Sequence, residues 1–266
     1  MRIRPALATL VLLATNVCAQ WINYPTPGIP RTADGKPNMA APAPRTADGK
    51  PDLSGLWQKA EPLPCDGITR VCTDLPVSRQ FFNIGADLKE GLPYKPEAKE
   101  KMAKKGLTDD PYLNCIAPGG PRMHLIPTMK KFVQTPALLV ILNEYNANFR
   151  QIFTDGRPLP DDPQPNWNGY STGKWEGDTL VVQSNGYRDD QWLDGAGSPL
   201  TSTARVTERF RRPRFGKLEI EITVDDPKSY TRPFAVVVNQ DLIVDTELLD
   251  AVCAENEKDA QHMPAK

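Results

Sequence analysis

The chain has 266 residues, of which 39% are hydrophobic and 24% are charged, and its formal net charge is -1. A balance this close to neutral excludes bulk electrostatic binding to nucleic acid, which requires a basic excess on the binding domain. The length that remains after an export signal suits one domain, because all-β folds reach this size as single units.

The first 19 residues have the pattern of an export signal. Arg2 and Arg4 precede the apolar run of residues 6–14, and Ala19 supplies the small residue required before a cleavage site. The apolar run is too short to anchor in a bilayer, and no later segment approaches the roughly 18 apolar residues of a transmembrane helix. We therefore expect a periplasmic or secreted protein, cleaved after Ala19 and without a transmembrane segment.

Removal of the signal leaves four cysteines in an oxidising compartment, and two disulfides are the simplest arrangement. These cysteines are Cys65, Cys72, Cys115 and Cys253. The short spacing favours Cys65 with Cys72, which leaves Cys115 to pair with Cys253 and to close a long loop. Zinc ligation is the alternative, but the chain has no paired CxxC motif and only two histidines. No metal or cofactor is predicted.

Residues 20–51 form a Pro/Ala-rich segment that contains a duplication. The octapeptide PRTADGKP occurs at residues 30–37 and again at residues 44–51. Two copies are too few for a solenoid. The segment has few large apolar residues, so burial cannot offset the entropy lost on ordering it. We expect an extended, mobile tether that leads into the ordered domain.

A single β-rich domain is predicted for residues 52–256, followed by a polar tail at residues 257–266. Its first strand lies in DLSGLW at residues 52–57, and prolines make residues 59–129 irregular. One helix is predicted near residues 96–105, with Pro96 in its first turn. We expect this helix to form a lid or pad over one end of the domain.

After residue 130 the hydrophobic pattern alternates with a period of two, which is typical of half-buried strands. Four hairpins are predicted, pairing residues 138–144 with 148–154, 173–175 with 179–182, 205–211 with 217–224, and 234–238 with 242–244. Successive hairpins without helices indicate an antiparallel meander, and closure into a barrel removes its exposed edges. The prediction is a mainly β, lipocalin-like closed barrel with a short C-terminal helix over residues 247–256.

Five strings in the chain resemble a family of uncharacterised exported bacterial proteins with a DGKPDLSG-W entry and a W-E-G-D-T-L-V hairpin. The strings are TADGKPDLSGLW, FTDGRPLP, GKWEGDTLVV, RVTERFRR and VDDPKSYTRP, and they span nearly all of the mature chain. The resemblance implies no assigned activity. Many relatives carry His near the positions of Tyr170 and Leu200, so it implies no histidine chemistry there in this chain. Residues 55–57 also resemble the opening of lipocalin-type barrels in architecture alone.

Face assignment in the predicted strands places two charged side chains among apolar ones. Glu208 shares a strand face with Val206 and Phe210, and Arg150 shares a face with Ile152. A carboxylate buried without a partner is costly, so it must find a cation, take up a proton or line a wet cavity. We predict that Glu208 and Arg150 meet inside the barrel, either facing a ligand or only fixing strand register.

The Pro-rich loop within residues 152–182 carries further candidates, because long loops on rigid scaffolds concentrate functional groups. Asp155 and Arg157 are placed at the barrel mouth, and Asp155 joins Glu208 as a candidate general acid or base. Aromatic side chains near the same loops either stack on a ligand or pack the barrel end. The ligand-binding candidates are Arg150, Arg157, Trp167, Tyr170, Trp175, Trp192 and Glu208.

Three functions are compatible with these patterns. The first is binding of a small, partly apolar ligand inside the barrel; the alternative is an extracytoplasmic hydrolase or isomerase that uses a buried carboxylate. The third is an envelope scaffold, favoured if the barrel interior is filled. His124 is expected in a loop, and the cluster of Arg211, Arg212 and Arg214 is interpreted as a solvated strand end rather than an anion site.

Overall fold

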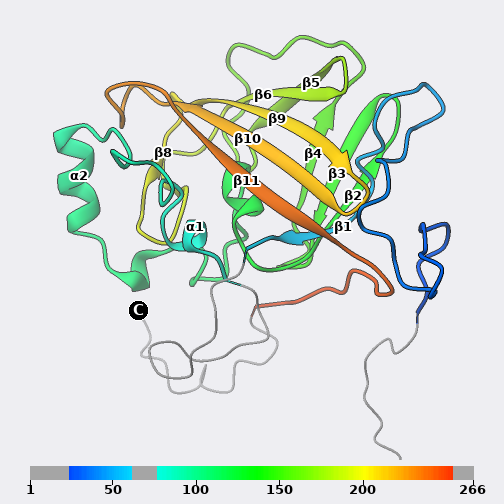
Figure 1. Ribbon diagram of the computed structural model, residues 1–266. Helices are drawn as coiled ribbons and strands as arrows, with labels where there is room; N and C mark the ends of the chain where they lie inside the picture. The colour runs from blue at the N-terminus through cyan, green and yellow to red at the C-terminus, as the bar shows by residue number, and fades with distance from the viewer. Residues whose placement is uncertain (1–23, 62–76, 254–266) are drawn as a thin grey trace, which may run out of the picture.

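The computed structural model describes residues 24–61 and 77–253. Nine strands close into a barrel in the order β1-β11-β10-β9-β6-β5-β4-β3-β2, with β2 pairing back to β1 (Figure 1). Neighbouring strands are antiparallel except β4 and β5, which are parallel and meet at Phe153 and Thr172. The predicted closed barrel is confirmed. Its sheet is mixed because the loop after β4 carries the chain back to the end of the barrel at which β4 begins, so that β5 runs parallel to β4.

The barrel strands are β1 (Gly55–Lys59), β2 (Lys130–Gln134), β3 (Leu138–Asn143), β4 (Phe149–Phe153), β5 (Tyr170–Glu176), β6 (Thr179–Asn185), β9 (Arg205–Arg214), β10 (Lys217–Asp225) and β11 (Phe234–Ile243). A separate two-stranded sheet consists of β7 (Gln191–Trp192) and β8 (Pro199–Leu200).

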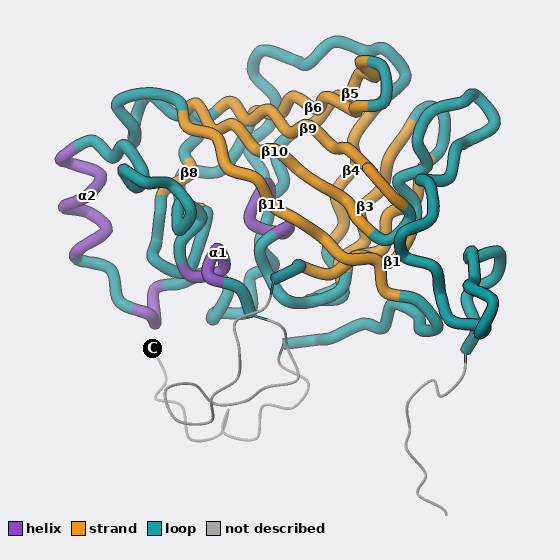
Figure 2. Tube along the Cα trace, in the orientation of Figure 1, coloured by secondary structure: helices purple, strands orange, loops and turns teal. Residues whose placement is uncertain are grey.

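The described part of the chain also contains α1 (Arg79–Phe82), α2 (Pro96–Ala103) and the 3-10 turns η1 (Leu107–Asp109) and η2 (Gly120–His124). Helix α2 confirms the predicted helix. Both α-helices lie to one side of the barrel and are connected by long loops (Figure 2). No helix within residues 24–61 and 77–253 is long and apolar enough to cross a membrane.

Three of the four predicted hairpins are confirmed, at β3–β4, β5–β6 and β9–β10. The fourth is wrong, because β11 runs without a break through residues 239–241. Gln240 is fully buried there, and its Nε2 donates a hydrogen bond to the His124 carbonyl oxygen at 2.7 Å. Gln240 therefore stays within the strand, although its polar side chain is typical of a turn, because His124 supplies it with a hydrogen-bond acceptor.

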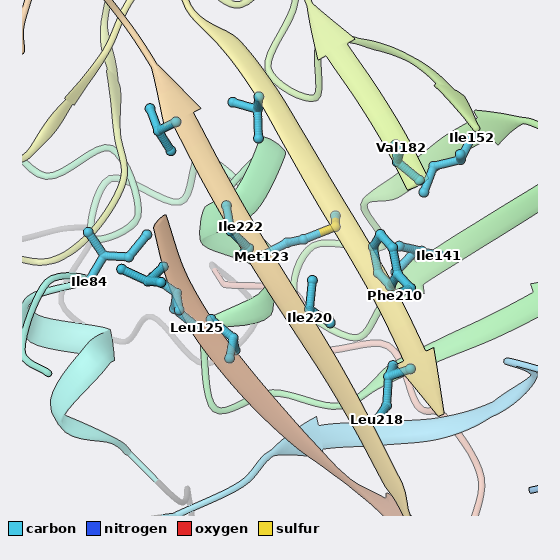
Figure 3. Close-up of a cluster of buried hydrophobic side chains, with 14 of the residues drawn as sticks. Ile84, Met123, Leu125, Ile141, Ile152, Val182, Phe210, Leu218, Ile220 and Ile222 are labelled. Atoms are coloured by element: carbon cyan, nitrogen blue, oxygen red, sulfur yellow. The ribbon is translucent and has the colours of Figure 1, made fainter. Parts of the chain in front are cut away.

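A plug segment, residues 118–128, occupies the interior of the barrel, and every residue in it is buried. Met123 and Leu125 of the plug segment belong to the same hydrophobic cluster as Ile220 and Ile222 of β10 (Figure 3). Each large apolar side chain buried in this way contributes about 1.5–3 kcal/mol to stability. The interior of the barrel is thus filled largely by side chains of the protein itself.

The Pro/Ala-rich segment is not an extended tether over residues 24–51. Each copy of PRTADGKP closes on itself in a tight loop, and each copy anchors its arginine to an aspartate of the barrel domain. Arg31 pairs with Asp245 at 3.1 Å, and Arg45 pairs with Asp178 at 2.6 Å. Met39, between the two copies, packs against the hydrophobic core. The expectation of an extended tether failed because it counted apolar residues and overlooked these specific polar anchors.

The C-terminal segment is extended rather than helical over residues 247–253. Ala251 pairs with Tyr145 in a parallel bridge, and Cys253 forms a disulfide with Cys115 across a Cα–Cα distance of 5.5 Å. The predicted Cys115–Cys253 bridge is therefore confirmed. Cys65, Cys72, residues 1–19 and the tail at 257–266 lie outside the described residues.

Lys130 of β2 is fully buried and gives a pH-dependent contribution to stability. Its Nζ donates hydrogen bonds to the carbonyl oxygens of Ile126 at 3.0 Å and Thr128 at 2.7 Å. Burial lowers the pKa of Lys130 from 10.5 to about 7. Between these two values the unfolded chain binds more protons than the folded protein does, so the free energy of unfolding rises with pH across this window.

We expect Lys130→Met to remove this rise, whose slope is at most about 1.4 kcal/mol per pH unit. Urea unfolding of the wild type and the variant at about pH 7 and about pH 9 measures the difference. Lys131→Met, at the adjacent half-buried position of β2, is the control and should keep the wild-type slope. Equal slopes in wild type and Lys130→Met would contradict the assignment.

Candidate functional site

Arg150 and Glu208 meet inside the barrel, as their strand faces predict. Arg150 comes from β4 and Glu208 from β9, and both side chains are completely buried. Arg150 Nη1 donates to Glu208 Oε1 at 3.0 Å, and Nη2 donates to Oε2, so the guanidinium and carboxylate form a two-pronged pair. Such pairs have the strongest geometry available to an arginine and a carboxylate.

Two serine hydroxyls complete the surroundings of this arginine. Ser171 Oγ of β5 accepts hydrogen bonds from Arg150 Nε at 3.3 Å and Nη2 at 3.1 Å, and Ser184 Oγ of β6 accepts from Nη2 at 3.0 Å. The two hydroxyls are 2.8 Å apart. The buried charge is therefore satisfied from three neighbouring strands, which is the condition for tolerating an ion pair in a core.

His124 is a third member of the buried cluster, and no pattern in its Pro-rich surroundings predicts this position. Its Nε2 lies 3.1 Å from Glu208 Oε1, although the two atoms are not aligned as a hydrogen bond, and its Nδ1 has no described partner. The ring centroid lies 5.6 Å from that of Phe210. Burial lowers the pKa of His124 more than its contact with Glu208 raises it, so the imidazole is neutral at pH 7.

The charge state of this cluster limits what it can do chemically. Burial by itself would raise the pKa of Glu208, but the charge and hydrogen bonds of Arg150 outweigh burial and lower it to about 2. Glu208 is consequently ionised, paired and fully buried at neutral pH. A general acid must hold a proton near the working pH and must reach its substrate. The cluster has the properties of a structural ion pair.

The candidates at the end of β4 gather at the β4–β5 seam and do not reach the buried pair. Arg157 donates to both carboxylate oxygens of Asp155, and its guanidinium lies 3.9 Å above the Phe153 ring centroid. Tyr170 stacks on Phe153 at 5.4 Å and accepts a hydrogen bond from Arg157. Hydrogen bonds from Arg157 lower the pKa of Asp155, which leaves this carboxylate ionised as well.

A cleft of about 720 Å³ lies beside α2, where the loops at one end of the barrel meet the helix. Two of the predicted ligand-binding residues line it, Trp167 and Trp192. Its apolar wall is completed by Ala98, Met102, Ile116 and Pro199. A cavity of this volume is within the range of roughly 300–1,000 Å³ that is typical of small-molecule sites. The helix predicted as a lid or pad therefore forms one side of a cleft.

Charged groups sit against the two tryptophans that line the cleft. Lys105 Nζ lies 4.7 Å from the Trp192 ring centroid, and the Arg188 guanidinium lies 4.9 Å from that of Trp167. Asp189, also on the cleft wall, accepts a hydrogen bond from Lys228 Nζ at 3.0 Å. The cleft thus combines aromatic surface with charges of both signs, and among them Lys105 lies against a ring while Asp189 and Lys228 pair with each other.

The loop that carries Trp167 is positioned by close backbone packing against the plug segment. A side chain at Gly119 would place its Cβ 1.8 Å from the Trp167 carbonyl oxygen, so only glycine fits there. Trp175, by contrast, is half-buried on β5, packs against the hydrophobic core and does not line the cleft. Of the three predicted tryptophans, Trp167 and Trp192 therefore line the cleft, and Trp175 packs against the core.

Within the described residues, no group of three or more His, Cys, Asp or Glu side chains is arranged to hold a metal ion. Asp194, in the aspartate-rich loop after β7, is fully buried and accepts hydrogen bonds from the backbone N–H groups of Ile84 and Ser198 and from the Ser198 hydroxyl. Its role there is to fix the loop that leads from β7 to β8.

Comparison of the chain with models of known protein families finds no match, and a search of curated proteins finds none either.

Proposed function

We propose that this protein is an exported β-barrel protein that binds a small, partly apolar ligand in the cleft beside α2. The observation that carries the proposal is the cleft itself, with about 720 Å³ of space and the side chains of Trp167 and Trp192 on its walls. Ligand sites in proteins are mostly apolar concave surfaces with a few charged or polar groups that orient the ligand, and this cleft matches that composition.

The cleft is preferred over the barrel interior because the interior groups already satisfy one another. Arg150, Glu208 and His124 are each no more than 1% exposed, and the plug segment packs around them. A ligand would have to displace buried side chains to reach Glu208. The filled interior also suits the scaffold alternative, but a scaffold does not require a ligand-sized cleft such as the one beside α2. The same burial, with a pKa of about 2, argues against the hydrolase or isomerase alternative for this carboxylate.

Export is supported by two features. The first 19 residues have the composition of a signal peptide, and the Cys115–Cys253 disulfide belongs to a class of bond that persists in oxidising compartments. Mass spectrometry of the protein recovered from an oxidising compartment, in native and denatured form, would report cleavage after Ala19 and any ligand that copurifies.

The cleft can be tested with N-phenyl-1-naphthylamine, a neutral apolar probe whose fluorescence increases when it leaves water. We expect saturable binding to the wild type and about tenfold weaker binding to Trp167→Ala, equivalent to about 1.4 kcal/mol. Trp175→Ala is the matched control, because Trp175 is also half-buried but lies outside the cleft. Equal affinities of the two variants, or no binding to the wild type, would overturn the assignment of the cleft.

A further inference from the structure

Arg212 differs from the solvated arginine that its sequence context predicts. Its neighbours follow the expectation: Arg211 pairs with Glu219 on the outer face of the barrel, and Arg214 is exposed. Arg212 points the other way and is only 5% exposed. Side chains along β9 point alternately outwards and inwards, so Arg212 is buried while Arg211 is exposed.

Arg212 forms no ion pair with any residue that the structure describes, because its hydrogen bonds all go to main-chain oxygens. Nε donates to Phe215 O at 3.1 Å, Nη1 donates to Asp52 O at 2.6 Å and Ser54 O at 3.1 Å, and Nη2 donates to Phe215 O at 2.6 Å. All of these acceptors are main-chain carbonyl oxygens, and the structure describes no side-chain acceptor for Arg212 within residues 24–61 and 77–253. A guanidinium has five N–H groups, and these four bonds leave one N–H of Nη2 unused.

The guanidinium also lies against two aromatic rings, which attract a cation and offset part of the cost of its burial but supply no negative charge. It lies 4.8 Å from the ring centroid of Trp57 and 5.2 Å from that of Phe215. Burial lowers the pKa of Arg212 to about 10, still well above neutrality, so the side chain remains a cation. A desolvated cation with a free donor favours an anion at the adjacent surface.

Arg212 lines a groove of about 270 Å³ between the N-terminal segment and the ends of β1 and β11. The other walls are mainly apolar and include Ile29, Leu56, Leu242 and Val244. Glu247 and Lys131 also line it, and they pair with each other at 2.6 Å. The groove therefore combines an apolar lining with Arg212, a cation that forms no ion pair with a described residue. The charge of Asp52, which also lines the groove, raises the pKa of Arg212, but burial lowers it more.

The outer wall of this groove is fixed in place. Thr26 N donates to Asp245 Oδ1 at 2.9 Å, and Asp245 N donates to Thr26 Oγ1 at 2.7 Å. Arg31 of the first PRTADGKP copy pairs with the same aspartate. A preformed wall lowers the ordering cost of binding, because little of the protein must be immobilised when a ligand enters.

We propose that this groove binds a small organic anion with an apolar body, such as a medium-chain carboxylate, with its carboxylate directed towards Arg212. The volume lies just below the roughly 300 Å³ at which drug-sized sites begin, so the ligand is small. The groove shares no lining residue with the cleft beside α2. The two sites are independent, and either can fail without the other.

Isothermal titration with octanoate and with 1-octanol separates charge recognition from apolar contact. The wild type is expected to bind octanoate at least about tenfold more tightly than octanol, because only the anion accepts a charge-assisted hydrogen bond. Arg212→Met is expected to remove this preference. Equal affinity of the wild type for octanoate and octanol would overturn the proposal.

A second pair of variants keeps the test valid if Arg212→Met fails to fold, since Arg212 holds three carbonyls in place. Val244→Trp fills the groove without altering the guanidinium and is expected to abolish octanoate binding. Val237→Trp adds the same ring at a position of β11 that is 50% exposed, and it should bind octanoate as the wild type does. Octanoate binding that survives Val244→Trp would place the anion elsewhere and refute the site.

Discussion

Replacement of Glu208 by Gln is expected to lower the free energy of unfolding by about 3–5 kcal/mol, because removing one partner of a buried ion pair leaves an uncompensated charge. That charge is the guanidinium of Arg150, which is 1% exposed and would keep only its two serine hydroxyls and a neutral amide. Urea unfolding at neutral pH measures the loss.

A double-mutant cycle with Arg150→Met tests whether the loss comes from the pair itself. The double variant should be more stable than the sum of the two single losses predicts, since it no longer contains an unpaired buried charge. Glu221→Gln, at an exposed position of β10, is the surface control and should change stability by no more than about 0.5 kcal/mol. A loss below about 1 kcal/mol for Glu208→Gln would mean that water reaches the pair.

The buried pair could be predicted from the sequence because β4 and β9 alternate clearly. In β9, Val206 and Phe210 mark one face as apolar, so Glu208 between them must be buried as well. A buried carboxylate needs a cation as its partner, and Arg150 is the arginine that the pattern places on another apolar strand face. The closure of the barrel followed from the same alternation, since successive hairpins without helices have few other ways to cover their edges.

Alternation gives no answer where both faces of a strand are apolar. Residues 138–142 of β3 are all aliphatic, so the pattern could not select the face that points inward. In the structure Leu139 and Ile141 are buried, and the face of Leu138 and Val140 is only partly covered. Glu144, which continues the outer face, is half-buried and accepts a hydrogen bond from Met129 N. Register in such a strand is decided by its neighbours.

The remaining differences come from contacts between segments that are distant in sequence. His124 lies in an irregular Pro-rich stretch, where no periodicity indicates burial, and it becomes fully buried because the plug segment enters the barrel. Gln240 remains in a strand because the same segment offers it a carbonyl oxygen. The cleft beside α2 likewise exists only once residues 97–116 meet Trp167 and Trp192, which no local pattern encodes.

Removal of the Cys115–Cys253 disulfide is expected to cost about 4 kcal/mol, because the bridge restricts a very long loop in the unfolded chain. The two cysteines are 138 residues apart. For a domain of this size the loss corresponds to a fall in Tm of roughly 8–16 °C. Thermal unfolding of the Cys115→Ser/Cys253→Ser variant measures it, and a fall of only a few degrees would mean that other contacts already restrict the C-terminal segment.

Cys115 also lies between two residues of the cleft wall, Asn114 and Ile116, so the same variant should weaken binding of N-phenyl-1-naphthylamine as well as stability. Asn146 connects the two half-cystines in the folded protein, since its Nδ2 donates to Cys115 O and its Oδ1 accepts from Cys253 N. The Cys65→Ser/Cys72→Ser variant is the control. If those cysteines pair as predicted, they close a much shorter loop, and their removal should have the smaller effect on both stability and the cleft.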